Sequence, residues 1–232
     1  MTDAPILKVT RESLASGTIM KMATARNDGA VDIASEEQLY ASRRQLVPDD
    51  ADCSDIWIFG YGSLIFNPVV DYVEQSHARI FGNHRRFCLW TRLGRGSPEC
   101  PGLVLALDRG GSCAGVGYQL NPKNAIDELD LLWRREMITM AYHARWLTLH
   151  TPRGRKRAIG FVARPDRPNY AARMPIEDEA GVIAAASGFI GPCRDYLFDT
   201  VAALRENGIS DPHLENLTQH VKQRLASDGG VG

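Results

Sequence analysis

Short apolar runs bounded by glycine, proline or aspartate occupy much of the chain between residues 56 and 164. The runs at 102–107, 115–120, 145–150 and 158–163 have the length and the boundaries typical of β-strands. After residue 164 the apolar positions take helical spacing, which predicts helices over 178–187, 192–207 and 211–226. Proline near the start of the last two and glycine after the first two are typical of helix boundaries. Strands followed by helices predict an α+β fold.

Two short helices are predicted near the N-terminus, within residues 1–54. Thr10 can cap the first, whose apolar positions are Leu14, Ile19 and Met22. Ser35 can cap the second, over residues 36–46, and Gln38 stands where a capping box needs it. Both helices are short, so they depend on packing for stability.

A stretch rich in proline and aspartate at residues 48–52 separates these helices from the first apolar strand. We therefore expect an N-terminal extension and linker over 1–54 and a main domain over 55–228. The extension is either partly disordered or docked on the main domain, and the pattern leaves both open. Because every motif with a candidate role lies at residue 56 or later, deletion of residues 1–52 is expected to leave a folded, active domain.

The loop after the first apolar run is a candidate binding site. The run stops at Gly60, and Gly62 follows on the other side of Tyr61. Glycine at both positions allows a positive φ and close approach of a ligand to the main chain. The amides of residues 62–64 can then converge on an anion or a carbonyl oxygen. The loop is not a complete dinucleotide-binding motif, because Ile65 stands where that motif needs its third glycine. The alternative to a binding loop is a tight turn between two core strands.

Glu136 is the candidate acid or base. A helix beginning at Asn121-Pro122 would place the apolar residues Ile126, Leu129 and Trp133 on one stripe, which Glu136 continues. A carboxylate on an apolar stripe near a helix C-terminus has a raised pKa, which suits proton transfer near neutral pH. The alternative is a helix that ends earlier, with Glu136 paired to Arg134 or Arg135 at the surface.

Composition narrows the functional class. The formal net charge of −1 gives no basic surface for nucleic acid or for an anionic membrane. No apolar run approaches the roughly 20 residues of a membrane-spanning helix, and the N-terminus lacks the order of a signal peptide. The five cysteines form no CxxC pair, which argues against a disulfide framework and against a structural zinc site. We expect a cytoplasmic protein that acts on a small molecule.

Several motifs, in order and at matching spacing, resemble those of the ChaC-type γ-glutamylcyclotransferases. The family carries a Phe-Gly-Tyr-Gly-Ser-Leu loop, an Arg-Arg-Phe-Cys segment, a Gly- and Pro-rich loop, a glycine-containing strand, an Arg-Glu pair and two C-terminal segments. The matching segments of this chain are 59–66, 85–88, 95–102, 115–118, 135–136, 188–197 and 208–214. The resemblance covers roughly residues 55–226, and so many ordered motifs are far more specific than any one of them.

The resemblance implies a small mixed β-barrel with flanking helices. It also implies that Glu136 is catalytic, and that the substrate is contacted by Gly60, Tyr61, Gly62, Ser63, Leu64, Ile65, Arg95 and Tyr142. Arg95 could instead serve as turn scaffold, and Tyr61 could pack as a core ring with its hydroxyl satisfied. The chain departs from the family at Thr139-Met140-Ala141, where family members carry glycines. Because of this departure, the resemblance does not predict the local backbone conformation or the shape of the site there.

The activity implied by the resemblance is the cleavage of glutathione into 5-oxoproline and cysteinylglycine, without metal or cofactor. A broader cyclotransferase acting on other γ-glutamyl amines is the alternative within enzymes. A noncatalytic regulatory protein linked to cation transport is the alternative from another class, and the presence of Glu136 disfavours it. The protein is expected to be a monomer or a homodimer.

Overall fold

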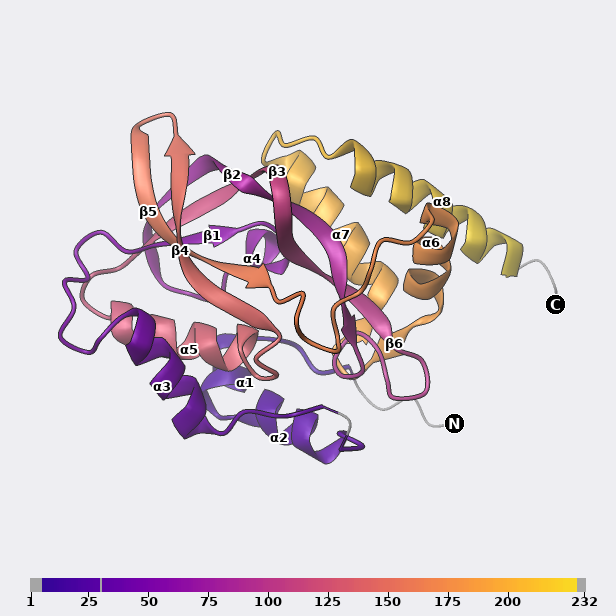
Figure 1. The fold of residues 1–232 in the computed structure, drawn as a ribbon, viewed down its shortest axis with the longest axis horizontal. Helices are drawn as coiled ribbons and strands as arrows, with labels where there is room; N and C mark the ends of the chain where they lie inside the picture. Colours follow the sequence, from indigo (N-terminus) through magenta and orange to yellow (C-terminus); the bar gives the residue numbers. More distant parts are fainter. Residues whose placement is uncertain (1–5, 30, 229–232) are drawn as a thin grey trace.

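A computed structural model describes residues 6–29 and 31–228 of the chain. Its centre is a closed five-stranded barrel with the strand order β1-β3-β2-β4-β5 (Figure 1). The strands are β1 (Trp57–Gly60), β2 (Tyr72–Thr91), β3 (Gly102–Leu120), β4 (Tyr142–Thr151) and β5 (Gly154–Ala163). Strand β1 pairs antiparallel with β3 and parallel with β5, so the barrel is mixed. This confirms the predicted α+β fold with a mixed barrel.

The long ribbon formed by β2 and β3 was only partly predicted. The runs at 102–107 and 115–120 are two ends of the single strand β3, which passes through Gly110 and Gly111 with positive φ. Its partner β2 has three irregularities in its pairing register with β3. Buried and exposed residues do not alternate regularly along β2, so its sequence lacks the alternation that predicts a strand. The runs at 145–150 and 158–163 lie within the β4/β5 hairpin, as predicted.

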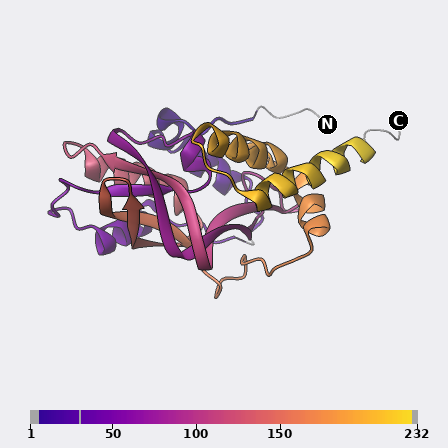
Figure 2. The same cartoon turned by 90° about the horizontal axis from the view of Figure 1, so that it is seen from above.

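Two groups of helices flank the barrel (Figures 1 and 2). One group comprises α6 (Ile176–Ala185), α7 (Cys193–Glu206) and α8 (Pro212–Asp228), close to the three predicted helices. The short pair β6 (Ser187–Gly188) and β7 (Gly191–Pro192) joins α6 to α7. On the other side, α5 (Ala125–Glu136) packs between the barrel and the N-terminal helices.

The start of α5 differs from its prediction. The helix begins at Ala125 with Asn124 as its N-cap, and Asn121 is not the cap. The side chain of Asn121 accepts the amide of Lys123 at 3.2 Å, which closes a local turn before the helix begins. An Asn side chain that bonds to the backbone two residues on favours a turn. The predicted stripe is nevertheless correct, because Leu129 and Trp133 are buried in the core.

The N-terminal helices dock on the main domain. They are α1 (Arg11–Ala15), α2 (Thr18–Ala25) and α3 (Glu36–Leu46). The single helix predicted after Thr10 is two helices, because the chain turns at Gly17 with a φ of 69°. The capping box of Ser35 and Gln38 is confirmed. A separate apolar cluster contains residues of both the N-terminal extension and the main domain. Its buried members are Leu14, Ile19, Ala23, Val69, Leu131, Ile138 and Phe189.

Ion pairs tie the same extension to α5. Arg11 donates to both carboxylate oxygens of Glu128, at 2.5 and 2.8 Å, and Glu128 is 1% exposed. Arg43 donates to Asp130 at 2.7 Å. Removal of residues 1–52 would expose the apolar cluster and leave both carboxylates without their arginines. We therefore expect the truncated chain to be less stable than the full chain, and its retention of fold and activity stays a prediction.

None of the helices within the described part of the chain is both long and apolar enough to span a membrane.

The Arg11–Glu128 pair gives a test of docking. Replacement of Arg11 by alanine is expected to lower the free energy of unfolding by about 1–3 kcal/mol, because it leaves a buried carboxylate short of donors. Arg44→Ala is the matched control, since Arg44 pairs with Asp49 at the surface, where both side chains are more than half exposed. That pair should contribute less than about 1 kcal/mol. Urea unfolding of both variants is the measurement, and equal effects would contradict the docking role of Arg11.

Candidate functional site

A cavity of about 490 Å³ lies at the C-terminal end of α5. This volume is in the range of roughly 300–1,000 Å³ that is usual for small-molecule sites. Segments far apart in the sequence meet there, including residues 6–10 of the extension. The polar and aromatic residues that line it include Ser63, Arg95, Arg135, Glu136, Thr139, Tyr142 and Tyr196. The structure thus brings together four of the predicted site residues: Ser63, Arg95, Glu136 and Tyr142.

Glu136 is the last residue of α5 and is only 12% exposed at its side chain. Its Oε1 lies 3.0 Å from Nε of Arg135, which is 8% exposed. Arg135 also donates to the main-chain carbonyl of Asn67. The predicted alternative of a surface ion pair is therefore wrong in its location, because the pair exists but is buried.

Burial determines the acidity of Glu136. Loss of solvent raises the pKa of this carboxyl above the usual range of a glutamate, and the charge of Arg135 offsets only part of the rise. A raised pKa brings the group nearer to neutral pH, where it can both accept and return a proton. This property makes Glu136 the best-placed acid or base in the cavity.

Two tyrosines stand beside this carboxylate. The hydroxyl of Tyr142 donates to the carbonyl of Leu105 at 3.1 Å. Burial and the charge of Glu136 raise the pKa of Tyr142 and of Tyr196, so both phenols keep their protons. Tyr196 was not singled out from the sequence, although it lies in the matching segment 188–197. Its position on α7 across the barrel from α5 could not be read from sequence spacing.

The glycines of the loop after β1 act through close packing. Neither Gly60 nor Gly62 has a positive φ, so that part of the prediction is wrong. A Cβ on Gly60 would lie 3.0 Å from the ring of Tyr118, and a Cβ on Gly62 would lie 2.8 Å from the hydroxyl oxygen of Tyr196. Close approach of neighbouring side chains therefore explains both glycines.

Few groups of this loop reach the cavity. Gly60, Tyr61, Gly62, Leu64 and Ile65 are not among the residues that line it, whereas Ser63 is. The ring of Tyr61 is buried, and its hydroxyl donates to the carbonyl of Phe161 at 2.7 Å, as in the core-packing alternative. The amide of Ile65 is occupied by the carbonyl of Gly62 at 2.9 Å.

The helix α4 (Ser63–Phe66) follows this loop, so the amides of Ser63 and Leu64 belong to its first turn and lack an intrahelical acceptor. A residue outside the loop fixes it in place. Arg85 donates to the carbonyl of Tyr61 at 2.7 Å and is itself held by Asp211 at 2.8 Å. The Arg-Arg-Phe-Cys motif therefore supports the loop and does not contact the cavity.

Arg95 projects its guanidinium toward the same cavity. One of its nitrogens donates to the carbonyl of Pro192 at 3.1 Å, and the guanidinium lies 5.8 Å from the centre of the Tyr196 ring. These contacts hold the cation at the cavity wall, beyond the role of a turn scaffold.

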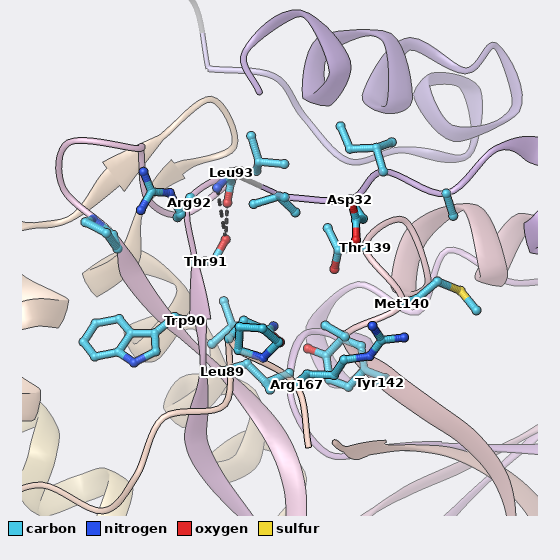
Figure 3. Close-up of a pocket in the computed structure, with 18 of the residues that line it drawn as sticks. Asp32, Leu89, Trp90, Thr91, Arg92, Leu93, Thr139, Met140, Tyr142 and Arg167 are labelled. Atoms are coloured by element: carbon cyan, nitrogen blue, oxygen red, sulfur yellow. Dashed lines mark hydrogen bonds between the residues drawn. The ribbon is translucent and has the colours of Figure 1, made fainter. Parts of the chain in front are cut away.

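The departure at Thr139-Met140-Ala141 changes the side chains more than the backbone. Met140 has a φ of 49°, a conformation that favours glycine. A methionine side chain therefore stands at a backbone conformation in the turn after α5 that favours glycine. Thr139 and Met140 line a second cavity, of about 1060 Å³, next to the first (Figure 3).

The chain resembles known proteins in sequence and in fold. The family model described as ChaC-like protein matches residues 56–224. Glutathione-specific gamma-glutamylcyclotransferase of Escherichia coli is 40% identical over 195 residues, which cover 84% of each chain. Glutathione-specific gamma-glutamylcyclotransferase 1 of Mus musculus is 34% identical over 179 residues, covering 74% of this chain and 80% of that protein.

A solved structure has the same fold. It is the gamma-glutamyl cyclotransferase specific to glutathione from yeast, with a TM-score of 0.66 and 23% identity. The match covers 73% of this chain and 96% of that one.

The contact between Gly62 and Tyr196 gives a test of the loop. Gly62→Ala is expected to lower stability by about 1–3 kcal/mol through overpacking. Tyr196→Phe in the same chain should restore most of the loss, because the next neighbour of that Cβ is Leu105 at 3.6 Å. Thermal unfolding measures both.

The matched control for this test is Gly181→Ala on α6, where a Cβ meets no atom within 4 Å. Alanine there should be neutral or stabilising by roughly 0.5–1 kcal/mol. A Gly62→Ala protein as stable as this control would mean that Gly62 is not required by packing.

Proposed function

Because the chain belongs to the ChaC-like protein family, we propose that it cleaves glutathione into 5-oxoproline and cysteinylglycine. The observation that carries the proposal is the buried carboxylate of Glu136, which lines a cavity at the end of α5. The names of the E. coli and mouse relatives give the substrate.

The reaction is an intramolecular cyclisation. The α-amino nitrogen of the γ-glutamyl group attacks its own γ-carbonyl carbon, and the bond from that carbon to the cysteine nitrogen breaks. Nucleophile and electrophile belong to one molecule, so the site needs only to hold the ring-closing conformer. Good intramolecular geometry contributes roughly 7–11 kcal/mol to lowering the barrier.

Glu136 moves the proton that this reaction must transfer. The α-ammonium group loses one proton to become nucleophilic and a second as the lactam forms, and the departing cysteine nitrogen gains one proton as its bond breaks and a second as it becomes an ammonium group. A carboxylate with a raised pKa can take each proton from the attacking nitrogen and return it to the leaving amine. The two steps balance, and the glutamate ends in its starting state.

Other groups of the cavity suit the charges of the substrate. The guanidinium of Arg95 is placed to bind the α-carboxylate, since arginine pairs well with planar carboxylates. The amide of Ser63, at the start of α4, is a donor for the oxyanion that forms at the γ-carbonyl. The assignment of these groups is part of the proposal.

The location in the cytoplasm is likewise proposed. All five cysteines are free thiols, which suits a reducing compartment.

The deciding experiment incubates the purified protein with glutathione and detects 5-oxoproline by mass spectrometry. γ-Glutamyl amino acids are the parallel substrates. Faster turnover of these than of glutathione would favour the broader cyclotransferase. No product from any of them would contradict an enzymatic role.

Glu136→Gln is expected to reduce kcat by at least about 100-fold, because an amide keeps the shape and cannot carry the proton. Binding of glutathione, measured by calorimetry, should persist. Glu99→Gln is the matched control, since Glu99 is exposed and does not line the cavity. Activity of Glu136→Gln within a few fold of wild type would overturn its role.

The pH profile tests the same carboxyl. As a base, Glu136 acts only when deprotonated, so kcat/KM should fall as pH decreases through its raised pKa. Arg135 lowers this pKa, so Arg135→Gln should move the acidic limb to higher pH, whereas Arg135→Lys, which keeps the charge, should move it less. An acidic limb unchanged in Arg135→Gln would show that another group controls it.

A further inference from the structure

The second cavity adjoins the catalytic one. It is lined by the end of β2, the turn after α5, the segment 167–169 and residues 31–34 of the extension (Figure 3). Both cavities share a wall made of Thr91, Leu93, Val104, Thr139 and Tyr142. A substrate with its reacting carbon at Glu136 would pass Thr139 and Tyr142 to reach the second cavity.

The charged residues that line the second cavity are Asp32, Arg92 and Arg167. Arg92 is bound to Asp28 at 2.8 Å. The side chain of Arg167 makes no ion pair or hydrogen bond to any residue that the structure describes, and its Nε is buried without a partner. The adjacent Asp166 is bound by Arg164 at 3.0 Å. Arg167 thus presents at this cavity a guanidinium that no described carboxylate binds by a hydrogen bond, although its charge also acts on the adjacent Asp166.

The backbone that carries Arg167 is firmly attached to the barrel. The amide of Tyr170 donates to the carbonyl of Arg167 at 3.0 Å. Two main-chain hydrogen bonds join this segment to β2. The amide of Trp90 donates to the carbonyl of Asn169, and the amide of Ala171 donates to the carbonyl of Cys88, each at 2.8 Å. The segment therefore runs along β2 with a fixed register, and it holds the arginine beside the cavity.

The substrate has a matching shape and charge. Beyond the γ-carbonyl, glutathione continues as cysteine and glycine and ends in a carboxylate. Two extended residues span at most about 7 Å, which suits a terminal anion in the chamber next to the catalytic one. Arginine binds such a carboxylate with two parallel hydrogen bonds.

We propose that the second cavity is the subsite for the cysteinylglycine half of glutathione and that Arg167 binds its terminal carboxylate. This inference rests on the proposed function and adds to it the feature that separates glutathione from shorter γ-glutamyl amines. Residues 31–34 close one side of the subsite, and the amide of Ala34 ties them to the carbonyl of Ile138 at 2.8 Å. The extension is therefore part of the binding site.

The test compares glutathione with its C-terminal amide, in which the glycine carboxylate is neutral. For the wild type, KM for the amide should exceed KM for glutathione by about 10-fold or more, which corresponds to about 1.4 kcal/mol. Arg167→Gln should raise KM for glutathione by a similar factor and leave KM for the amide unchanged, with kcat for both within a few fold. The discrimination between the two substrates should disappear.

Two control variants locate the effect. Arg164→Gln removes a neighbouring cation that does not line either cavity, and it should leave the discrimination intact. Lys8→Gln removes a cation that lines only the catalytic cavity. Loss of discrimination in Lys8→Gln with its retention in Arg167→Gln would overturn the proposal and place the glycine end along residues 6–10.

Calorimetric titration with cysteinylglycine measures the subsite without turnover. The wild type should bind this dipeptide at least about 10-fold more tightly than Arg167→Gln does. Absence of any effect of Arg167→Gln on both the dipeptide and the KM ratio would overturn the subsite. Failure of the proposed function gives a different result, namely no 5-oxoproline from glutathione in the wild type.

Discussion

The buried ion pair of Arg135 and Glu136 is the constraint on which the site depends. Transfer of two charges from water into a protein interior is costly, and their attraction repays it only with good geometry and further hydrogen bonds. Here the 3.0 Å contact and the bond from Arg135 to the carbonyl of Asn67 supply both. The arrangement keeps the carboxyl of Glu136 buried with a raised pKa, which a solvated glutamate would not have.

That pair stays in place because α5 is held on two sides. Trp133 packs edge-on against Phe161 of the barrel, with ring centres 5.7 Å apart. On the opposite side, Glu128 and Asp130 bind the arginines of the N-terminal extension. The extension thus stabilises the helix whose last residue is Glu136. It also walls both cavities, although the family model begins only at residue 56.

The sequence predicted those features that depend on local pattern. The capping box of Ser35 and the apolar stripe leading to Glu136 were correct, because spacing along a helix fixes which residues share a face. Motifs in order predicted the barrel. The start of α5 was misplaced by three residues, since the side chain of Asn121 closes a local turn with the amide of Lys123 and the helix begins only after Asn124.

Features that depend on contacts between segments distant in the sequence could not be predicted. The close packing at Gly62 involves the hydroxyl group of Tyr196, which lies more than 100 residues away in the sequence. Docking of the extension depends on the buried carboxylate of Glu128, which no local pattern marks as a partner of Arg11. The cavity lining contains residues from both ends of the chain, so its shape follows from the fold as a whole.

The charges of the two cavities explain how one site can both bind and activate the substrate. In the catalytic cavity Arg135 and Glu136 neutralise each other, which leaves Arg95 and Lys8 as excess positive charge. In the proposed reaction, this positive charge would bind the α-carboxylate and would also lower the pKa of the adjacent α-ammonium group. The amine therefore loses its proton more readily, and only its neutral form can attack the γ-carbonyl. In the proposed subsite, the separate cation of Arg167 would hold the glycine end without adding to the charge around the reacting carbon. Division of the two substrate carboxylates between two cavities would then leave the positive charge at Arg95 and Lys8 to the γ-glutamyl end.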